Sequence, residues 1–319
     1  MLILHIFIFL LSCLFLVLSA KWFIDSLTGI AKCLGWKEFV VAFFTVSLGA
    51  VAPEFFIGIS SAINDIPELA FGNIIGQNIF LLSFTIGVCA LVLKGGIEVE
   101  SKTVRSGSTF AIIAAILPLI LILDGNLSRS DGFILLSFFI AFIFWLFSKK
   151  ERFRKIYEGA EEQKGLCAVF KNFGGLILGL VLIVISAEGI VRSSIIFSDI
   201  LGISLPMIGI LIVAVGVGLP ETYFSVMLAK KGQSWMILGG LMGAIAMSST
   251  LVLGLVAIIN PINLDLAEIP SLVVARVFLL ICALLYLFFV RSGKKISTKE
   301  GIILLSIYIS FVVLEILIK

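Results

Sequence analysis

The sequence has few charged side chains and almost no histidine. Charged residues make up 13% of the 319 residues, and the one histidine, His5, lies near the N-terminus. A soluble globular domain carries roughly 25% charged residues, so this chain cannot cover a water-facing surface. The lack of a histidine cluster argues against a transition-metal site built from imidazole ligands. The net charge of +3, with no basic patch on a polar face, argues against a nucleic-acid partner.

Cysteine is also scarce, and its spacing forms no motif. The five cysteines contain no CxxC pair of the kind that binds metals or carries out redox chemistry. Free cysteine behaves as a small buried hydrophobe, and we interpret all five in this way. They are Cys13, Cys33, Cys89, Cys167 and Cys282.

Apolar sequence, in contrast, is abundant. Hydrophobic residues make up 61% of the chain, and the mean hydropathy is +1.23. A helix needs about 20 apolar residues to cross the hydrocarbon core of a membrane. The segments close to this length are 2–20, 39–63, 68–93, 107–124, 132–148, 172–191, 205–229, 235–259, 270–290 and 301–318. The first lacks the basic region that begins a secretory signal, so we interpret it as a mature helix. The sequence predicts an all-α polytopic membrane protein, surrounded by the lipid bilayer, with about ten transmembrane helices.

Lysine and arginine are distributed unevenly among the loops. Loops after odd-numbered spans hold 19 of the 23 basic residues, including seven in the segment 149–171. The even-numbered loops and the C-terminus hold Arg129, Arg192, Arg276 and Lys319. Basic loops tend to stay in the cytoplasm. We therefore expect 149–171 and the other odd loops to be cytoplasmic, and both termini to be extracytoplasmic.

The chain matches itself when it is shifted by 167 residues. The coinciding positions, without a gap, are Ser19-Ala20 with Ser186-Ala187, Leu34-Gly35 with Leu201-Gly202, Gly49 with Gly216, Pro53-Glu54 with Pro220-Glu221, Ala62 with Ala229, Gly72 with Gly239, Gly76 with Gly243 and Gly87 with Gly254. Each half holds five spans, an odd number, so the second half must cross the membrane inverted. Inverted repeats are typical of secondary transporters, whose substrate site lies near midplane. We expect one five-helix repeat over 1–148, a linker loop over 149–171 and a second repeat over 172–319.

Glu54 and Glu221 are the acidic residues that lie deep inside predicted spans. A charge at bilayer depth costs several kcal/mol or more, so such residues face a cavity or a partner. Each follows a proline, which removes one backbone donor and frees a carbonyl one turn back. We expect both helices to be broken there, with free carbonyls beside the carboxylate. Such oxygen chemistry suits Na⁺, Ca²⁺ or protons, although two protonated glutamates at simple helix kinks would fit the same pattern.

Two short motifs recur in both halves. One reads Gly49-Ala-Val-Ala-Pro-Glu54 and Gly216-Val-Gly-Leu-Pro-Glu221. The other reads Gly72-Asn-Ile-Ile-Gly-Gln-Asn-Ile-Phe-Leu81 and Gly239-Gly-Leu-Met-Gly-Ala-Ile-Ala-Met-Ser248. With the ten spans and inverted halves, the chain resembles the cation/calcium exchanger (CaCA) superfamily of the sodium/calcium exchanger type over nearly its whole length. The motifs of that family are Gly-Thr-Ser-x-Pro-Glu and Gly-Asn-x-x-Gly-Ser-Asn-x-x-Asn/Asp.

This resemblance implies a secondary cation antiporter, not an enzyme, which works by alternating access. Its gating pair would be spans one and six. Its partners would be inorganic cations, such as Ca²⁺, Na⁺ or H⁺, and it would need no cofactor. The implied ion ligands are Glu54, Glu221, Gln77, Ser248 and the backbone carbonyls of Ser47 and Ala214, seven residues before each glutamate. Nothing in the sequence indicates an oligomeric state.

The chain departs from the family motifs at several oxygen-bearing positions. The hydroxyl pair of the first motif is Ala50-Val51 in one half and Val217-Gly218 in the other. In the second motif, Gln77 and Ala244 stand for the serine. Ca²⁺ takes six to eight oxygen ligands, and protonation of desolvated carboxylates is a second way to couple transport. A proton-coupled exchanger and a non-transporting paralogue with a degenerate site therefore stay open as alternatives. A membrane-embedded enzyme has no supporting constellation of side chains.

Overall fold

The structure is a computed structural model of the chain. It describes residues 2–33, 49–93, 95–99, 102–148, 166–230, 232, 234–264, 269–293 and 295–317. In the first half the helices are α1 (Leu2–Cys33), α3 (Gly49–Ile63), α4 (Pro67–Phe80), α5 (Ile86–Val92), α6 (Lys102–Leu121) and α7 (Arg129–Ser148). The π-helical turn η2 (Leu81–Thr85) joins α4 to α5, and the 3₁₀ turn η3 (Ile122–Asp124) follows α6. In the second half they are α8 (Leu166–Leu201), α9 (Leu205–Ile208), α10 (Ala214–Lys230), α11 (Ser234–Met247), α12 (Leu253–Ile259), α13 (Ile269–Ser292) and α14 (Thr298–Leu317). The π-helical turn η5 (Gly209–Val213) joins α9 to α10, and η6 (Ser248–Val252) joins α11 to α12.

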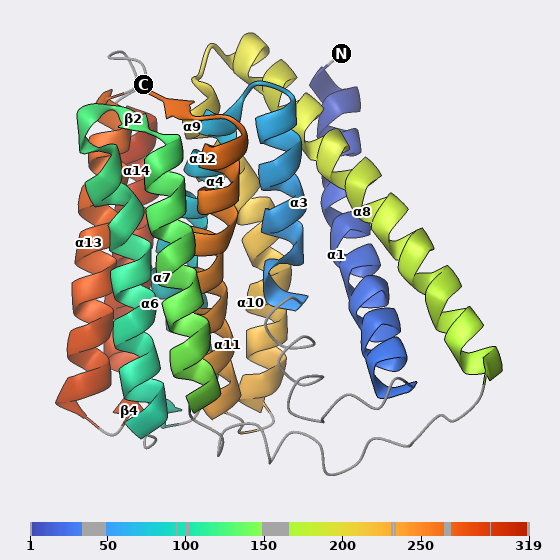
Figure 1. The fold of residues 1–319 in the computed structure, drawn as a ribbon. Coiled ribbons are helices and arrows are strands. Elements are labelled where there is room, and N and C mark those ends of the chain that lie inside the picture. Colours follow the sequence, from blue (N-terminus) through green and yellow to red (C-terminus); the bar gives the residue numbers. More distant parts are fainter. Residues whose placement is uncertain are drawn as a thin grey trace.

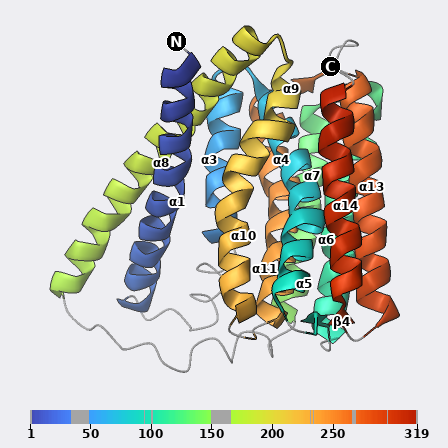
Figure 2. The same ribbon diagram turned by 180° about the vertical axis from the view of Figure 1, so that it is seen from behind.

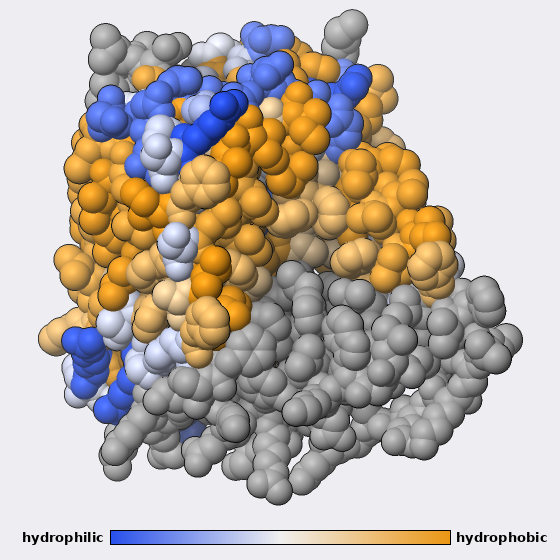
Figure 3. All heavy atoms as spheres, viewed as in Figure 1, coloured by the Kyte–Doolittle hydropathy of each residue, from blue (hydrophilic) through white to orange (hydrophobic). Residues whose placement is uncertain are grey.

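These helices make ten passes within the described residues, five in each half, which confirms the predicted all-α polytopic fold. Eight of the helical segments are long and apolar enough to cross a membrane, and Val51–Ile63 is a shorter apolar helix. On the face shown in Figure 3, hydrophobic side chains form a broad band between more hydrophilic ends. Both termini lie at the same end of the bundle, as an even number of passes requires (Figures 1 and 2).

Two short ribbons join the halves in a reciprocal way. Strand β1 (Ile97–Glu98) of the first half pairs antiparallel with β4 (Lys295–Ile296) of the second. Strand β2 (Asn126–Leu127) pairs in the same sense with β3 (Ile262–Asn263). Exchanging the two halves therefore converts one ribbon into the other. The ribbons close opposite ends of the bundle, as expected for halves of opposite orientation (Figure 1).

The irregular turns carry the same symmetry. The π-helical turn η2 covers residues 81–85 and η6 covers 248–252, an offset of 167 residues, as in the sequence repeat. The last helix of each half also begins with the same cap. Ser128 donates from its backbone N–H to Asp131 at 2.9 Å, and Ser297 donates to Glu300 at 2.6 Å. Such reciprocal caps satisfy the free donors of a helix N-terminus. The two inverted five-helix repeats are thus visible in the local geometry.

The first helix of each half is longer than the sequence predicted. Helix α1 extends thirteen residues past the expected end at residue 20, so Lys21 lies on an exposed helical face and not in a loop. Helix α8 begins at Leu166, so the last six residues of the expected linker 149–171 are helical. At 1.5 Å per residue these helices of 32 and 36 residues are about 48 and 54 Å long. Both are tilted in the bundle, which lets them exceed the membrane thickness (Figure 1).

The breaks expected at the two prolines are absent, and this prediction is wrong. Helix α3 contains Pro53 and α10 contains Pro220, and each helix continues past its proline. A proline ring presses on the carbonyl four residues earlier, which belongs to Gly49 or Gly216. A glycine has no Cβ and can let that carbonyl tilt aside. The irregular turn in the second half is instead η5, which ends seven residues before Pro220.

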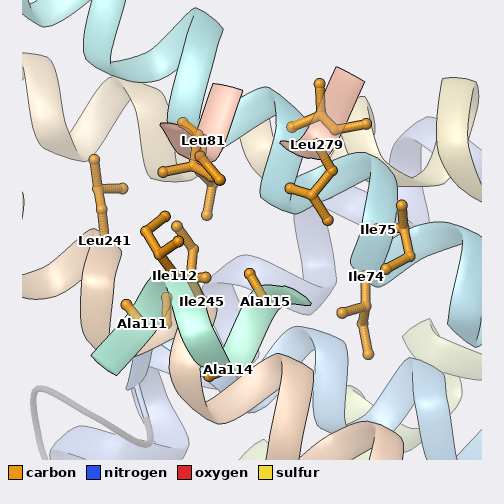
Figure 4. Packing of buried hydrophobic residues seen from close by; sticks show 14 of the residues in the cluster. Ile74, Ile75, Leu81, Ala111, Ile112, Ala114, Ala115, Leu241, Ile245 and Leu279 are labelled. Atoms are coloured by element: carbon orange, nitrogen blue, oxygen red, sulfur yellow. The ribbon is translucent and has the colours of Figure 1, made fainter. Parts of the chain in front are cut away.

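Buried side chains form two separate clusters. The larger one fills the bundle of α4 to α7 and α11 to α14. There Ile112 and Ala115 of α6 lie close to Ile245 of α11, with Leu81 and Leu279 in the same cluster (Figure 4). The smaller one lies between the α1–α8 pair and the facing sides of α3 and α9–α10, and it includes Leu16, Ile57, Ile183 and Val213. The α1–α8 pair therefore packs on the bundle through its own apolar contact.

Glycine positions on α4 allow close backbone packing and give a test of this fold. A Cβ added at Gly76 would lie 2.5 Å from the carbonyl oxygen of Ile210, a rigid neighbour in η5. Its repeat counterpart Gly243 faces open space. We expect Gly76→Ala to destabilise the protein by about 1–3 kcal/mol through overpacking. Gly243→Ala should be neutral or slightly stabilising. Thermal unfolding in detergent measures both, and equal melting temperatures for the two variants would contradict the packing.

Candidate ion-binding site

The repeat-related glutamates meet at the contact between the two halves. Glu54 comes from α3 and Glu221 from α10, and the two carboxylates share one partner, Gln77 of α4. The Nε2 of Gln77 donates to Oε1 of Glu54, and to Oε2 of Glu221 at 3.3 Å. Glu54 and Gln77 are each 2% exposed. A carboxylate that is shut off from water must be stabilised by protein donors or by a cation.

Small residues bring α4 and α10 close enough for this arrangement. Gly72 of α4 packs on α9, where an added Cβ would lie 2.1 Å from the carbonyl oxygen of Pro206. Gly218 of α10 accommodates the ring of Phe80, which would lie 2.6 Å from an added Cβ. Glycine thus sets the separation of the helices that carry Gln77 and Glu221. The Gly-rich motifs of the sequence act through backbone packing here.

Several side-chain oxygens beside this contact are buried without a donor. In the part of the chain that the structure describes, Oε2 of Glu54, Oε1 of Gln77, Oδ1 of Asn78 and Oδ1 of Asn73 accept no hydrogen bond. An unsatisfied buried acceptor costs about 1–3 kcal/mol. Three of these side chains lie on α4 within six residues of one another. Carboxylate and amide oxygens of this kind are the ligands that hard cations prefer.

Hydroxyl groups next to the glutamates connect further helices. Thr222, directly after Glu221, donates to the carbonyl oxygen of Gly218 at 3.0 Å and lies 2.7 Å from the hydroxyl of Thr85. The other connection runs from α4 to η6, where Nδ2 of Asn78 donates to Oγ of Ser249 at 2.8 Å. Sequence reasoning missed Thr85, Thr222 and Ser249. Two of the three adjoin predicted site residues, which is the signal that could have found them.

The predicted ligands are placed as follows. Glu54, Glu221 and Gln77 are brought together. Ser248 is buried at the start of η6, and its hydroxyl donates to the carbonyl oxygen of Ile245, 3.3 Å away in the same helix. Ala214 is buried at the first position of α10, directly after η5. Ser47 lies outside the described residues. The ligand roles of all six residues stay predictions.

A second polar cluster joins the α1–α8 pair to the bundle. Glu188 of α8 accepts hydrogen bonds from the hydroxyl of Ser60 on α3 at 2.7 Å and from the amide of Asn64, in the turn directly after α3, at 2.9 Å. Its other carboxylate oxygen pairs with Nε of Arg192 at 2.7 Å. Glu188 was not singled out from the sequence, although it lies inside the predicted span 172–191. Ser60 and Asn64 lie more than a hundred residues away from it in the chain.

The number of acidic groups limits what kind of site this is. Within the described residues, no group of three or more His, Cys, Asp or Glu side chains is arranged to hold a metal ion. Glu54 and Glu221 thus supply the carboxylates, and any further ligands come from neutral oxygens. Carboxylates with neutral oxygens suit a cation that binds and leaves. The fold and this site define a polytopic membrane protein of the inverted-repeat transporter class.

Comparison with known proteins identifies the family. The family model for the sodium/calcium exchanger protein matches residues 4–148 and 171–317. The chain therefore belongs to the sodium/calcium exchanger protein family. It is 28% identical to the sodium/calcium exchanger MaX1 of Methanosarcina acetivorans, covering 96% of this chain and 97% of that one. It is also 28% identical to the putative antiporter CaxA of Alkalimonas amylolytica, with 98% of each chain covered.

Solved structures agree with this assignment. A structure of the sodium-calcium exchanger NCX_Mj superimposes with a TM-score of 0.62 at 25% identity, covering 98% of this chain and 99% of the other. The similarity spans both halves. The family is one of transporters that exchange ions across a membrane, and the protein is accordingly a multi-pass membrane protein.

The hydrogen bond between Asn78 and Ser249 gives a testable prediction. Ser249→Ala removes a buried acceptor and leaves the amide of Asn78 without its partner in η6. We expect a loss of about 1–3 kcal/mol of stability. Ser137→Ala is the matched control, since its exposed hydroxyl donates only to Phe133 of its own helix. Thermal unfolding in detergent compares the two variants, and a Ser249→Ala protein as stable as the control would contradict the contact.

Proposed function

We propose that this protein is a secondary cation antiporter, with Glu54 and Glu221 as the central ion ligands. The main supporting observation is that one carboxylate from each inverted half accepts a hydrogen bond from the same side chain, Gln77. A site at the contact between inverted repeats can be reached in turn from either side of the membrane. The similarity of this chain to sodium/calcium exchangers supports Na⁺ and Ca²⁺ as the exchanged ions.

The ligand set follows from the oxygens near the glutamates. Two carboxylates balance the charge of one Ca²⁺ ion. The side chains of Gln77 and Ser248 and the carbonyls of Ser47 and Ala214 would complete its coordination. Neither Ala50-Val51 nor Val217-Gly218 offers a hydroxyl, so this chain has fewer oxygens on either side of the central position than the family motif provides. We therefore propose one central cation position as the main site.

Alternating access would come from the α1–α8 pair. These helices lie antiparallel against each other and contact α3 and α9–α10 through the smaller apolar cluster (Figure 2). Apolar contacts allow one surface to slide along another, and the hydrogen bonds from Ser60 and Asn64 to Glu188 would have to break during such a motion. We propose that the pair moves past the bundle and exposes the glutamates first to one side and then to the other. The basic loops would face the cytoplasm and both termini the outside.

Radiolabelled Ca²⁺ uptake into proteoliposomes tests the exchange. We expect uptake to require an outward Na⁺ gradient, and to fall at least tenfold in Glu54→Gln and Glu221→Gln, because each variant removes one of the two charges that balance Ca²⁺. Glu98→Gln, on the exposed strand β1, is the matched control and should transport normally.

The counter-ion decides between the alternatives. Uptake under an outward H⁺ gradient, in place of Na⁺, would make the protein a proton-coupled exchanger. A protein that binds Ca²⁺ but gives no uptake under either gradient would be a non-transporting member of the family, and the antiport proposal would be wrong.

The contacts of Glu188 test the proposed motion. Glu188→Gln removes the charge that accepts from Ser60 and Asn64, and losing about 1 kcal/mol shifts a conformational equilibrium about fivefold. Cys13 of α1 is buried and faces Gly216 of α10. With the other four cysteines replaced by alanine, we expect Cys13 to be alkylated about fivefold faster in Glu188→Gln. Lys21→Gln, at the repeat-equivalent position on α1, is the control.

An unchanged alkylation rate of Cys13 would mean that the Glu188 contacts do not hold the α1–α8 pair. Equal acceleration in Lys21→Gln would point to a general loosening of the protein and would likewise contradict the assigned role of Glu188.

A further inference from the structure

The side chain of Gln77 presents its donor end, not its oxygen, to the glutamates. Its Nε2 group carries two hydrogens and donates to Glu54 and to Glu221, while Oε1 accepts nothing within the described residues. The opposite orientation would place an amide oxygen against carboxylate oxygens, so that acceptors would face acceptors. The hydrogen bonds to the carboxylates thus select this orientation.

Ca²⁺ takes six to eight oxygen ligands, so with only two carboxylates at this contact a bridging Ca²⁺ is expected to use both oxygens of each. One of these oxygens, Oε2 of Glu54, is free, but two others are those to which Gln77 donates. Hydrogen bonds to ionised groups are roughly twice as strong as neutral ones. A bridging cation must therefore displace both before it gains its own contacts. A cation held by one carboxylate alone leaves the second hydrogen bond in place. The amide thus opposes bridging more than it opposes binding to a single glutamate.

We propose that Gln77 is a specificity-determining residue, because its amide must release Glu54 and Glu221 before a divalent cation can use both oxygens of each carboxylate. This inference rests on the proposed role of the two glutamates in binding cations. Rotation of the released amide about its last side-chain bond exchanges Nε2 with Oε1. The same side chain then changes from a competitor of the cation into one of its ligands.

Among the described residues, Gln77 is the amide that donates to both carboxylates, and its repeat counterpart cannot do the same. Its repeat counterpart is Ala244, which has no polar atoms in its side chain and is 4% exposed. A serine, as in the family motif at position 77, would be shorter and would carry a single donor. It could not donate to both glutamates at once. Gln77 therefore gives an otherwise symmetric pair of carboxylates a shared donor from one half.

Ca²⁺ binding to the purified full-length chain in detergent, measured by titration calorimetry in Na⁺-free buffer, tests the inference. The key variant is Gln77→Met, which keeps the length of the side chain and removes both its donors and its oxygen. The loss of two hydrogen bonds to ionised carboxylates should outweigh the loss of one neutral oxygen ligand. We expect Ca²⁺ to bind about tenfold more tightly, which corresponds to about 1.4 kcal/mol. If Gln77 acted only as an oxygen ligand, the same variant would bind Ca²⁺ more weakly. The sign of the change therefore decides.

A second variant and a control guard against a folding defect. Gln77→Ser should also tighten Ca²⁺ binding, because serine cannot donate to both glutamates. Ser61→Ala removes a buried hydroxyl that donates to Ile57 of its own helix at 2.8 Å, and it should bind Ca²⁺ as the parent protein does. Weaker or unchanged binding in whichever of the two Gln77 variants folds would overturn the inference.

Uptake measured on the same proteins separates this inference from the antiport proposal. Tighter Ca²⁺ binding by Gln77→Met in a protein without uptake would support the inference and contradict antiport. Normal uptake by the parent protein together with weaker Ca²⁺ binding by Gln77→Met would support antiport and contradict the inference about Gln77. Absence of Ca²⁺ binding in the parent and in both Gln77 variants would overturn both proposals.

Discussion

The exclusion of water from the bilayer interior is the constraint on which this structure depends. Every backbone polar group that faces hydrocarbon must find its hydrogen-bond partner within the protein, and polar side chains there are costly without one. The backbone does so through helices that stay continuous, even past Pro53 and Pro220. The carboxylates do so through contacts between helices, with Gln77 beside Glu54 and Glu221, and with Ser60 and Asn64 beside Glu188. These polar side chains therefore also hold the helices together through hydrogen bonds.

The two groups of hydrogen bonds, around Gln77 and around Glu188, connect different helices. The first joins α3, α4 and α10, helices from both halves whose separation is fixed by glycine contacts. The second joins α8 to α3, across the smaller apolar cluster that otherwise holds the α1–α8 pair to the bundle. A bundle fixed by backbone contacts, beside a helix pair held by side chains, fits the alternating access that we propose for this protein. Each half contributes its first helix to the pair and the rest to the bundle.

Much of this could be predicted from the sequence, for physical reasons. Glu54 and Glu221 stand out because charge is costly in an apolar run, and their offset of 167 residues reappears in η2 and η6. Helix ends were less predictable. Helix α1 continues through Lys21 because a long basic side chain on an exposed face can extend toward water. The predicted helix breaks at Pro53 and Pro220 were wrong, since both helices continue past the proline, and a glycine lies one turn before each.

The finer features of the site depend on contacts that no local pattern encodes. The sequence placed Gln77 near the glutamates but could not show which end of its amide faces them, since that is decided by two carboxylates on other helices. The pairing of Thr85 with Thr222 needs η2 to lie against α10. Glu188 was overlooked, and its partners Ser60 and Asn64 could not be found from the sequence because they lie more than a hundred residues away in the chain.

The length of α1 and α8 has a consequence for the lipid. Both helices present many large apolar side chains to their surroundings, among them Phe7, Leu14 and Ile185. The angle at which a long helix lies depends on the thickness of the hydrocarbon layer, at a cost of fractions of a kcal/mol per Å of mismatch. A thicker membrane favours a more upright pair and a thinner one a more inclined pair. Acyl-chain length and sterol content thereby act on the same helices whose motion we propose for transport.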